Sequence, residues 1–336
     1  MQTDKPLISI LMAVYEPNLE WFREQLESLE SQTYPNLRLY VCDDGSQRIT
    51  FTEIDLCIRK CIHSFPYEIW RNEANMGSNW TFERLTREAK GAYFAYCDQD
   101  DIWLSEKLEI LYKELHDFGA LLVCSDMYII DGRKNEIADS ITKIRRRHHF
   151  RNGTGLAEGL LLHNFVTGCT MLVQAKVAKA AVPFCPHMVH DHYLALWCAA
   201  HGEIRSLARP LIRYRIHGGN QTGVLSGVAD KTSYGNIRIT SLLLRLQWLR
   251  QNFPCDEVLR NKIETRLRWT EARQRNWEHY GGKRLLWKYR NFSLLPSVFE
   301  LFAAELPEPL FRLFLNCGKY SFQTGLRAWF RRKQNR

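Results

Sequence analysis

Short apolar runs alternate with amphipathic segments along the first part of the chain. Residues 7–14, 37–42 and 92–96 are nearly continuous apolar runs, as is typical of buried strands in a parallel sheet. Between them, residues 19–31 and 80–90 carry apolar side chains at helical spacing. This alternation predicts an α/β fold in which a mostly parallel sheet is flanked by helices.

The same pattern continues beyond residue 100. Residues 120–126, 165–173 and 210–216 are predicted to form further strands, the second of them entered through a tight turn, and residues 187–200 an apolar helix. The polar and basic stretch 141–155 interrupts the pattern and is predicted to be a mobile loop.

Polar side chains follow several of the predicted strands at the point where each strand ends. Asp43 and Asp44 end the strand 37–42, Asn75 follows a further predicted strand at residues 67–70, and Asp98 and Asp100 follow the strand 92–96. Ligands of open α/β sheets bind beyond the carboxyl ends of the strands. These side chains are therefore predicted to lie at one binding edge of the sheet.

The carboxylates of the run 96–103 suggest a cation site. Asp98, Asp100 and Asp101 crowd together directly after an apolar strand, where like charges repel unless a cation lies among them. Hard oxygen ligands suit Mg²⁺ or Mn²⁺. A solvated turn followed by a helix cap is the alternative interpretation.

The positive charge of the chain is concentrated near its C-terminus. The net charge is +9 overall, but residues 225–336 carry +12 and residues 1–224 carry −3. Residues 241–251 and the later Leu-, Phe- and Trp-rich segments have helical patterns with Arg between the apolar positions. We therefore expect two domains, 1–224 and a helical, basic region 225–336. That region either binds a membrane surface or packs as an ordinary subdomain.

Several function classes find no support in the residue patterns. The ten cysteines form no C-x-x-C pair, which argues against a zinc site. No apolar run reaches membrane-spanning length, and no signal-peptide pattern opens the chain. Together with unpaired cysteines, this predicts a cytoplasmic protein. The basic region lacks the motifs of nucleic-acid-binding domains, so we expect no nucleic-acid partner.

The motifs together resemble a known family. The segments concerned are Ile8–Tyr15, Ser28–Tyr34, Val41–Ser46, Asn75–Gly77, Ala89–Tyr93 and Cys97–Trp103, with Asn164–Thr170 and Tyr214–His217 beyond them. They are similar to the signature of family 2 glycosyltransferases, which have the nucleotide-sugar-binding GT-A fold. The Asp-Gln-Asp-Asp-Ile-Trp form looks most like bacterial rhamnosyltransferases of surface-polysaccharide assembly, such as O-antigen enzymes. The resemblance covers about residues 7–222.

The resemblance implies roles for individual residues. Ala13, Tyr15, Asp44, Asn75, Gly77 and Asp98 would bind the nucleotide sugar, with Asp44 accepting from the base and Asp98 near the ribose or metal. Asp98, Asp100 and His217 would hold Mg²⁺ or Mn²⁺ on the diphosphate. Thr167, Gly168 and Cys169 would shape the acceptor site. His217 as an ordinary turn residue and Cys169 as a small buried residue are the alternatives.

The resemblance aligns Asp191 with the general base. Helix capping is the alternative role for this residue, and His187, His190 and His192 around it suggest a less favoured transition-metal cluster. Two departures from the family pattern stand out. Histidines flank the base at 190 and 192, and Glu16 replaces the usual Asn after Tyr15.

The implied activity is inverting, metal-dependent transfer from a nucleotide sugar, with dTDP-rhamnose expected as donor and UDP-sugars as the alternative. The acceptor would be a glycan or lipid-linked glycan, and the enzyme would sit on the cytoplasmic face of the bacterial inner membrane. A catalytically silent nucleotide-sugar-binding protein is the alternative from another class.

Overall fold

The computed structural model describes residues 5–145, 148–217 and 227–316. The chain divides into two compact units, Met1–Gly218 and Gly219–Arg336. The predicted domain boundary at residues 224/225 and the basic residues 331–336 lie outside the described residues.

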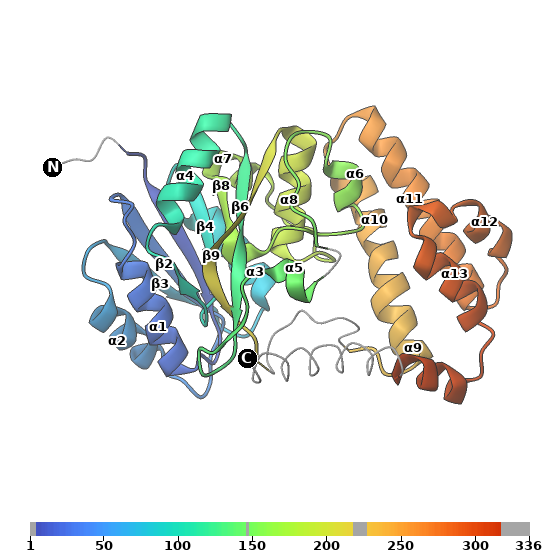
Figure 1. Ribbon diagram of the computed structural model, residues 1–336, viewed down its shortest axis with the longest axis horizontal. Coiled ribbons are helices and arrows are strands. Elements are labelled where there is room, and N and C mark those ends of the chain that lie inside the picture. The colour runs from blue at the N-terminus through green and yellow to red at the C-terminus, as the bar shows by residue number, and fades with distance from the viewer. Residues whose placement is uncertain (1–4, 146–147, 218–226, 317–336) are drawn as a thin grey trace. The chain divides into compact units, whose positions relative to one another are not determined.

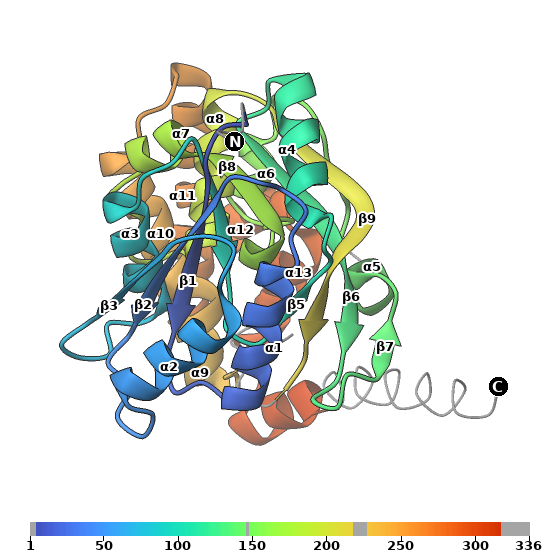
Figure 2. The same cartoon turned by 90° about the vertical axis from the view of Figure 1, so that its left-hand side faces the viewer.

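A single mixed sheet forms the centre of the first unit (Figures 1 and 2). Its strand order is β3-β2-β1-β4-β8-β6-β9-β5, with β7 paired to β6. Strands β1 to β4 run parallel, β6 and β9 are parallel to each other, and β5, β7 and β8 pair antiparallel with their neighbours. The strands are β1 (Ile8–Val14), β2 (Leu37–Asp43), β3 (Tyr67–Arg71), β4 (Tyr93–Cys97), β5 (Ile102–Trp103), β6 (Leu122–Ile130), β7 (Glu136–Ala138), β8 (Met171–Gln174) and β9 (Ile204–Arg215).

Helices cover the sheet, with α1 and α2 packed together on one face and α3 and α8 on the other (Figures 1 and 2). The helices of this unit are α1 (Leu19–Glu30), α2 (Phe51–Cys61), α3 (Ser78–Glu88), α4 (Lys107–Phe118), α5 (Ile141–Ile144), α6 (Ala157–Leu160), α7 (Ala175–Ala180) and α8 (His190–His201). Local sequence fixes where they begin. Asn18 caps α1 through its side chain, and Thr50 and Glu53 form a capping box on α2.

The predicted fold class is confirmed, while some predicted element bounds were wrong. The predicted strand 165–173 is only β8, because the tight turn expected before it extends over Gly168–Thr170 as a turn of 3₁₀-helix. Strand β9 begins at Ile204, six residues before the predicted start, since its pairing with β6 carries it past polar positions. Within the predicted loop 141–155, residues Ile141–Ile144 form α5, which begins where Asp126 accepts from the backbone N–H of Ile141.

The described part of the second unit is helical, as predicted. Its elements are α9 (Lys231–Tyr234), a π-helical segment (Gly235–Thr240), α10 (Ser241–Asn252), α11 (Glu257–Trp277), α12 (Lys283–Lys288), a 3₁₀ turn (Arg290–Phe292), α13 (Leu294–Ala303) and helical residues 308–316. Tyr234, Ile239, Ala303 and Phe311 belong to its buried core. Among the residues that the structure describes, no helix has the length and apolarity needed to cross a bilayer.

A buried ion pair joins two helices of this unit. The Arg273 guanidinium of α11 donates to both carboxylate oxygens of Glu300 on α13, at 2.7 and 2.6 Å. The Tyr234 hydroxyl donates to the same carboxylate at 2.9 Å, and Asn276 donates to the Glu300 backbone carbonyl. Since both charged side chains are almost completely buried, removing either would leave the charge of the other without an ionic partner.

We expect Arg273→Met to lower the free energy of unfolding of the second unit by about 3–5 kcal/mol, because the Glu300 charge would stay buried without its partner. The matched control is Arg275→Met, an exposed arginine on the same helix, which should change stability by less than about 0.5 kcal/mol. Urea unfolding followed by tryptophan fluorescence measures both. Equal midpoints for the two variants would contradict a stabilising role for the pair.

Candidate functional site

The carboxyl ends of three neighbouring strands bring the predicted donor residues together. In the parallel register, Val14 of β1 lies beside Asp43 of β2, and Met12 of β1 lies beside Cys97 of β4. The residues that leave these strands, Tyr15, Asp44 and Asp98, therefore start from one edge of the sheet. Ala13 lies one residue back from the end of β1 and is partly exposed.

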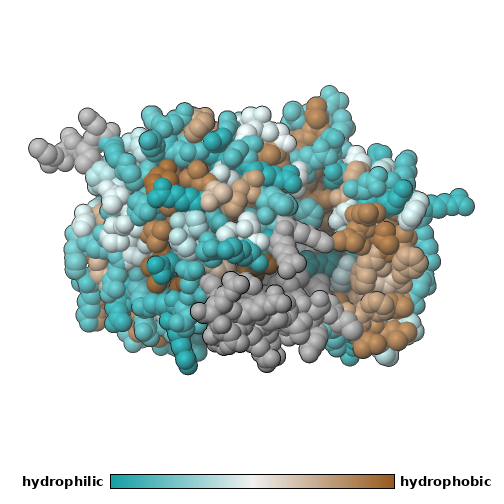
Figure 3. Space-filling view, in the orientation of Figure 1, coloured by the Kyte–Doolittle hydropathy of each residue, from teal (hydrophilic) through white to brown (hydrophobic). Residues whose placement is uncertain are grey.

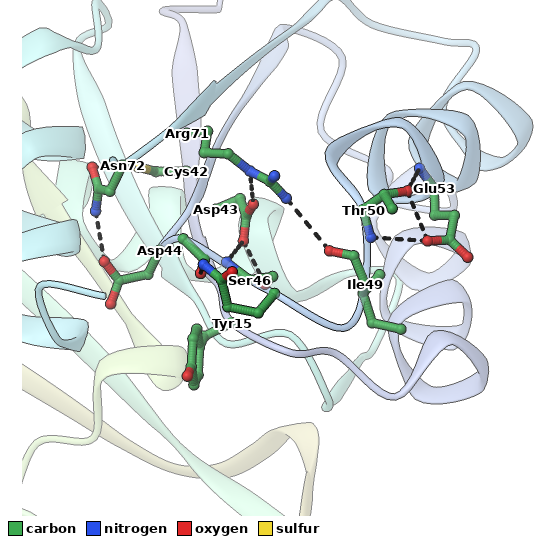
Figure 4. Close-up of polar contacts among 12 residues, drawn as sticks. Tyr15, Cys42, Asp43, Asp44, Ser46, Ile49, Thr50, Glu53, Arg71 and Asn72 are labelled. Atoms are coloured by element: carbon green, nitrogen blue, oxygen red, sulfur yellow. Dashed lines mark hydrogen bonds and ion pairs between the residues drawn. The ribbon is translucent and has the colours of Figure 1, made fainter. Parts of the chain in front are cut away.

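Asp44 holds the loop between β3 and α3. Its Oδ1 accepts from the Asn72 side-chain amide at 2.7 Å and from the Met76 backbone N–H at 2.9 Å. Its Oδ2 accepts from the Gly77 backbone N–H at 2.8 Å. The side-chain oxygen of Asn75 accepts from the same N–H at 3.0 Å. The predicted residues Asp44, Asn75 and Gly77 thus form one hydrogen-bonded group, with the link to Asn72 visible in Figure 4.

The neighbouring Asp43 stabilises the loop that follows β2. Its fully buried carboxylate accepts from the Ser46 hydroxyl at 2.6 Å and pairs with the Arg71 guanidinium of β3 (Figure 4). Gly45, with φ of 74°, permits this tight turn, since a Cβ there would lie 2.7 Å from the Ala74 backbone. The loops after β2 and β3 are thereby held against each other.

The end of β1 is fastened to the carboxylate motif by Gln99. The Gln99 side-chain oxygen accepts from the Tyr15 backbone N–H at 2.8 Å, and its amide nitrogen donates to the Tyr15 carbonyl at 3.0 Å. The Tyr15 ring remains exposed at this edge. Glu16, the departure from the family pattern, accepts from the backbone N–H groups of Arg48 and Gln47, which lower the pKa of its carboxyl. It therefore organises the loop at the rim of the site.

Two of the three clustered carboxylates lie beside Cys169. Ligand atoms of Asp98, Asp101 and Cys169 all lie within 4.8 Å of one another. Burial, together with the charges of Asp100 and Asp191, raises the pKa of Asp98 to about 7. Burial and the Asp100 charge raise the pKa of Asp101 well above its usual value. The crowding predicted from the sequence is therefore present.

Two buried cations lie against this acidic cluster. Lys107 is fully buried, donates to the Cys169 carbonyl at 2.6 Å, and lies over the Trp103 ring at 3.0 Å from its centroid. Its burial lowers the pKa of the ammonium group to about 7. Arg215, also fully buried, donates through its backbone N–H to Asp101 at 3.0 Å and through its side chain to the Asp100 carbonyl at 2.8 Å. Arg215 thereby holds the loop after β4 in place, and Lys107 holds the turn before β8.

Asp100 is paired with His217, the other residue predicted to contact a metal. The distance from Asp100 Oδ2 to His217 Nε2 is 2.6 Å, and both side chains are partly exposed. The His217 ring also packs against the Trp21 ring, with centroids 5.0 Å apart. Residues separated by more than a hundred positions in sequence are thus brought into one group at the end of β9.

Asp191 lies in the first turn of α8 and is held by the turn before β8. Its Oδ2 accepts from the Gly168 backbone N–H at 2.9 Å, and its Oδ1 accepts from the Asn164 side chain at 3.1 Å. Burial raises the pKa of the Asp191 carboxyl to about 6. The Thr167 carbonyl accepts from the Thr170 backbone N–H, which closes this turn. The predicted base and the predicted acceptor turn are therefore in direct contact.

The two histidines that flank Asp191 contact other parts of the fold. The His190 ring lies against the Phe82 ring, with centroids 4.0 Å apart, and its burial lowers the pKa of the imidazole to about 3, so that it is neutral. A Cβ on Gly168 would lie 2.6 Å from its Nε2. The His192 Nε2 lies 2.6 Å from the Leu160 carbonyl oxygen. Neither histidine contributes to the group of ligand atoms formed by Asp98, Asp101 and Cys169.

The residues at this edge fit a divalent cation. Several carboxylate oxygens converge, the charge of Asp100 raises the pKa of both Asp98 and Asp101, and Asp101 Oδ2 is buried without a hydrogen-bond partner among the described residues. Asp98 and Asp100 carry hard oxygen donors, and the His217 nitrogen lies next to Asp100. Asp101 is a further donor that the sequence interpretation did not assign.

Sequence reasoning missed the residues that hold the site together. Gln99 lies within the recognised motif, so its position was a usable signal, and Asp101 was noticed in the acidic run without being assigned a role. The sequence gives no signal for the role of Lys107, since a lysine in the first turn of a helix is usually solvated. Asn164 was quoted as part of the resemblance without a role, and the structure places its side chain on Asp191.

We expect Asp98→Asn to stabilise the metal-free protein at pH 8. A raised carboxyl pKa means that the folded state binds the proton more tightly than the unfolded state does, so stability falls as the pH rises from about 4 to about 7. The asparagine removes that loss, by about 1–3 kcal/mol at pH 8 and almost nothing at pH 4. Thermal unfolding with chelator, with exposed Asp117→Asn as control, measures this. A stability gain of Asp98→Asn that is the same at every pH would contradict the raised pKa of Asp98.

Proteins whose sequences are similar to this chain are described as uncharacterised glycosyltransferases. An uncharacterised glycosyltransferase of Rickettsia typhi is 27% identical over 197 residues, which span 58% of this chain and 58% of that protein. One from Methanocaldococcus jannaschii is 24% identical over 267 residues, spanning 76% of this chain and 84% of that protein. The alignment thus covers less than two thirds of the Rickettsia protein.

Solved structures share the fold at low sequence identity. Staphylococcus aureus TarS 1-349 in complex with UDP-GlcNAc has a TM-score of 0.54 and 14% identity, covering 89% of this chain and 90% of that one. Mannosyltransferase PcManGT from Pyrobaculum calidifontis, in complex with GDP-Man and Mn²⁺, has a TM-score of 0.56 and 15% identity, covering 97% and 84%. The model of the family described as glycosyl transferase family 2 matches residues 9–180, just over half of the chain. The protein therefore belongs to glycosyl transferase family 2.

Proposed function

We propose that the protein transfers a sugar from a nucleotide donor to an acceptor hydroxyl, with inversion at the anomeric carbon and with a divalent cation. The observation that carries this proposal is the proximity of the predicted metal and base residues. Asp98 follows β4 and lies within 4.8 Å of the Cys169 sulfur, measured between ligand atoms, while the neighbouring Gly168 donates to Asp191 in the first turn of α8. The charge of Asp191 also raises the pKa of Asp98. A cation-binding edge and a candidate general base thus share one site.

The Asp191 carboxylate is suited to act as the base. Its hydrogen bonds from Gly168 and Asn164 fix its orientation. With a pKa near 6, the group is mostly ionised at neutral pH and is a stronger base than an ordinary aspartate. As the acceptor oxygen attacks the anomeric carbon, its proton passes to Asp191 and the nucleoside diphosphate leaves. A single displacement of this kind inverts the anomeric carbon.

Asp98 and Asp100 would hold the cation, with His217 beside Asp100. When bound, the ion would neutralise charge on the leaving diphosphate. The fold of the manganese-containing mannosyltransferase resembles this one, which supports such a requirement. Gln99 and Arg215 would keep the ligand loop in position through their contacts with Tyr15 and Asp100.

For the donor we propose dTDP-rhamnose, with UDP-sugars as the alternative, on the resemblance of the Asp98–Trp103 motif to rhamnosyltransferases. Ala13, Tyr15, Asp44, Asn75 and Gly77 would surround the nucleotide. The solved structures of similar fold hold UDP-GlcNAc and GDP-Man, which supports a nucleotide-sugar donor.

The acceptor we propose is a glycan or lipid-linked glycan of bacterial surface polysaccharide, bound near Thr167, Gly168 and Cys169. The enzyme would then work on the cytoplasmic face of the inner membrane. A catalytically silent protein that only binds the donor is the alternative, and turnover distinguishes the two.

We expect Asp100→Ala to abolish Mn²⁺-dependent donor binding, because it removes a proposed ligand of the cation and the partner of His217. Isothermal titration with dTDP-rhamnose, UDP-glucose, UDP-GlcNAc and GDP-mannose, each with Mn²⁺ and with chelator, measures this. Exposed Asp117→Ala is the control and should bind as the wild type does. Unchanged affinity of Asp100→Ala in Mn²⁺ would refute the metal assignment.

We expect Asp191→Asn to retain donor binding but to lose at least about 100-fold in turnover, since the amide cannot accept the proton. In the wild type, the rate should rise with pH up to about 6 and then level off, because the base must be ionised. Donor hydrolysis or transfer at a series of pH values measures both effects. A variant with wild-type turnover would place the base elsewhere.

A further inference from the structure

The second unit carries large apolar side chains on its outside. Figure 3 shows hydrophobic residues gathered over the region of α13. Phe302 is 70% exposed and Leu295 60% exposed, and the other exposed apolar side chains of this region are Leu285, Trp287, Leu294, Leu310, Leu313 and Phe314. We call these eight residues the apolar face. Clustering of this kind marks an interaction surface, whereas single exposed apolar residues do not.

Helix α13 is arranged with its polar residues inward. Ser297 and Glu300 are fully buried, where Ser297 accepts from the Trp269 indole and Glu300 pairs with Arg273. Leu294 and Phe302 are instead exposed. Ala303 and Phe299 also face the core, so the notable feature of α13 is that its exposed positions are apolar, where a surface helix ordinarily exposes polar side chains.

The helical residues 308–316 are apolar on both sides. Phe311 is buried in the core of the unit. Leu310, Leu313 and Phe314 are exposed, and their spacing of three and four residues places them on one side of a helix. The Phe299 and Phe311 rings lie 6.1 Å apart, which packs this segment against α13.

Basic side chains adjoin the apolar face. Arg284 and Lys288 are exposed on α12. The Arg290 guanidinium lies 4.3 Å from the centroid of the half-exposed Trp287 ring, and its side chain also donates to the Trp287 carbonyl at 2.8 Å. Apolar side chains next to Trp and Arg are typical of helices that lie in the headgroup region of a bilayer.

We propose that the apolar face binds the surface of an anionic lipid bilayer. Its Leu and Phe side chains would enter the boundary between headgroups and acyl chains, and Arg284, Lys288 and Arg290 would meet the headgroups. A second copy of the chain is the competing occupant. It fits less well, because a two-fold contact would bring the same basic residues toward one another. The proposal rests on the proposed function in one respect: membrane binding would give the enzyme access to a lipid-linked acceptor.

The test uses the full chain and vesicles of phosphatidylglycerol with phosphatidylethanolamine. The wild type should sediment with them, less so in high salt, and more weakly with phosphatidylcholine alone. The double variant Leu295→Glu with Phe302→Glu should bind at least about tenfold more weakly, because two apolar anchors become anionic. The matched control is Leu56→Glu, which changes a 48% exposed leucine of α2 in the first unit and should bind as the wild type does.

These point variants are preferable to truncation after Pro307, because truncation would remove the buried Phe311 and Leu315. Equal sedimentation of the wild type and the double variant, or no sedimentation of either, would overturn the proposal. So would a dimer in light scattering that the double variant converts to a monomer. Donor-induced thermal stabilisation of the double variant should equal that of the wild type. A failure of lipid binding is thereby separated from a failure of the proposed function.

Discussion

The arrangement of the first unit depends on keeping several carboxylates together at the end of β4. Isolated buried carboxylates are costly, and two or more together are costlier still. The fold meets this with two fully buried cations, Lys107 and Arg215, which come from α4 and β9. Arg215 also pairs with Glu24 of α1 at 2.7 Å. The contacts that offset the charge of the acidic cluster therefore also connect the helices and strands around it. A change at the site would in this way disturb the packing around the sheet as well.

Much of the fold followed from local pattern. The apolar runs that became β1, β2 and β4 were recognisable because strands buried on both faces need continuous apolar sequence. The short strand β5 was not foreseen, since two residues have no periodicity and their pairing with β9 is made at long range. A turn near residues 167–169 was expected, but not that it is a 3₁₀-helix at Gly168–Thr170 whose first N–H donates to Asp191.

For the site, residue types could be predicted but pairings could not. Asp98 and Asp100 stood out because carboxylates crowded after a strand suggest a bound cation, whereas Asp191 was assigned through the family resemblance alone. That Asp100 meets His217, while Asp98 lies with Asp101 and Cys169, is decided by the sheet order. Lys107 was passed over because charged residues are rarely fully buried unless paired, and its surroundings are assembled only on folding.

The hydrogen bonds of Asp44 limit what its side chain can recognise. Oδ1 already accepts from Asn72 and Met76, and Oδ2 accepts from Gly77, which leaves one acceptor position on the carboxylate. A nucleobase that met this position would be sensed through a single ring N–H. Uracil and thymine both present that N–H, whereas cytosine does not. Such a contact selects against cytosine but does not distinguish bases by their C5 methyl group. A choice between uridine and thymidine nucleotides must therefore come from the protein surface that contacts the methyl group or the 2′ position of the sugar.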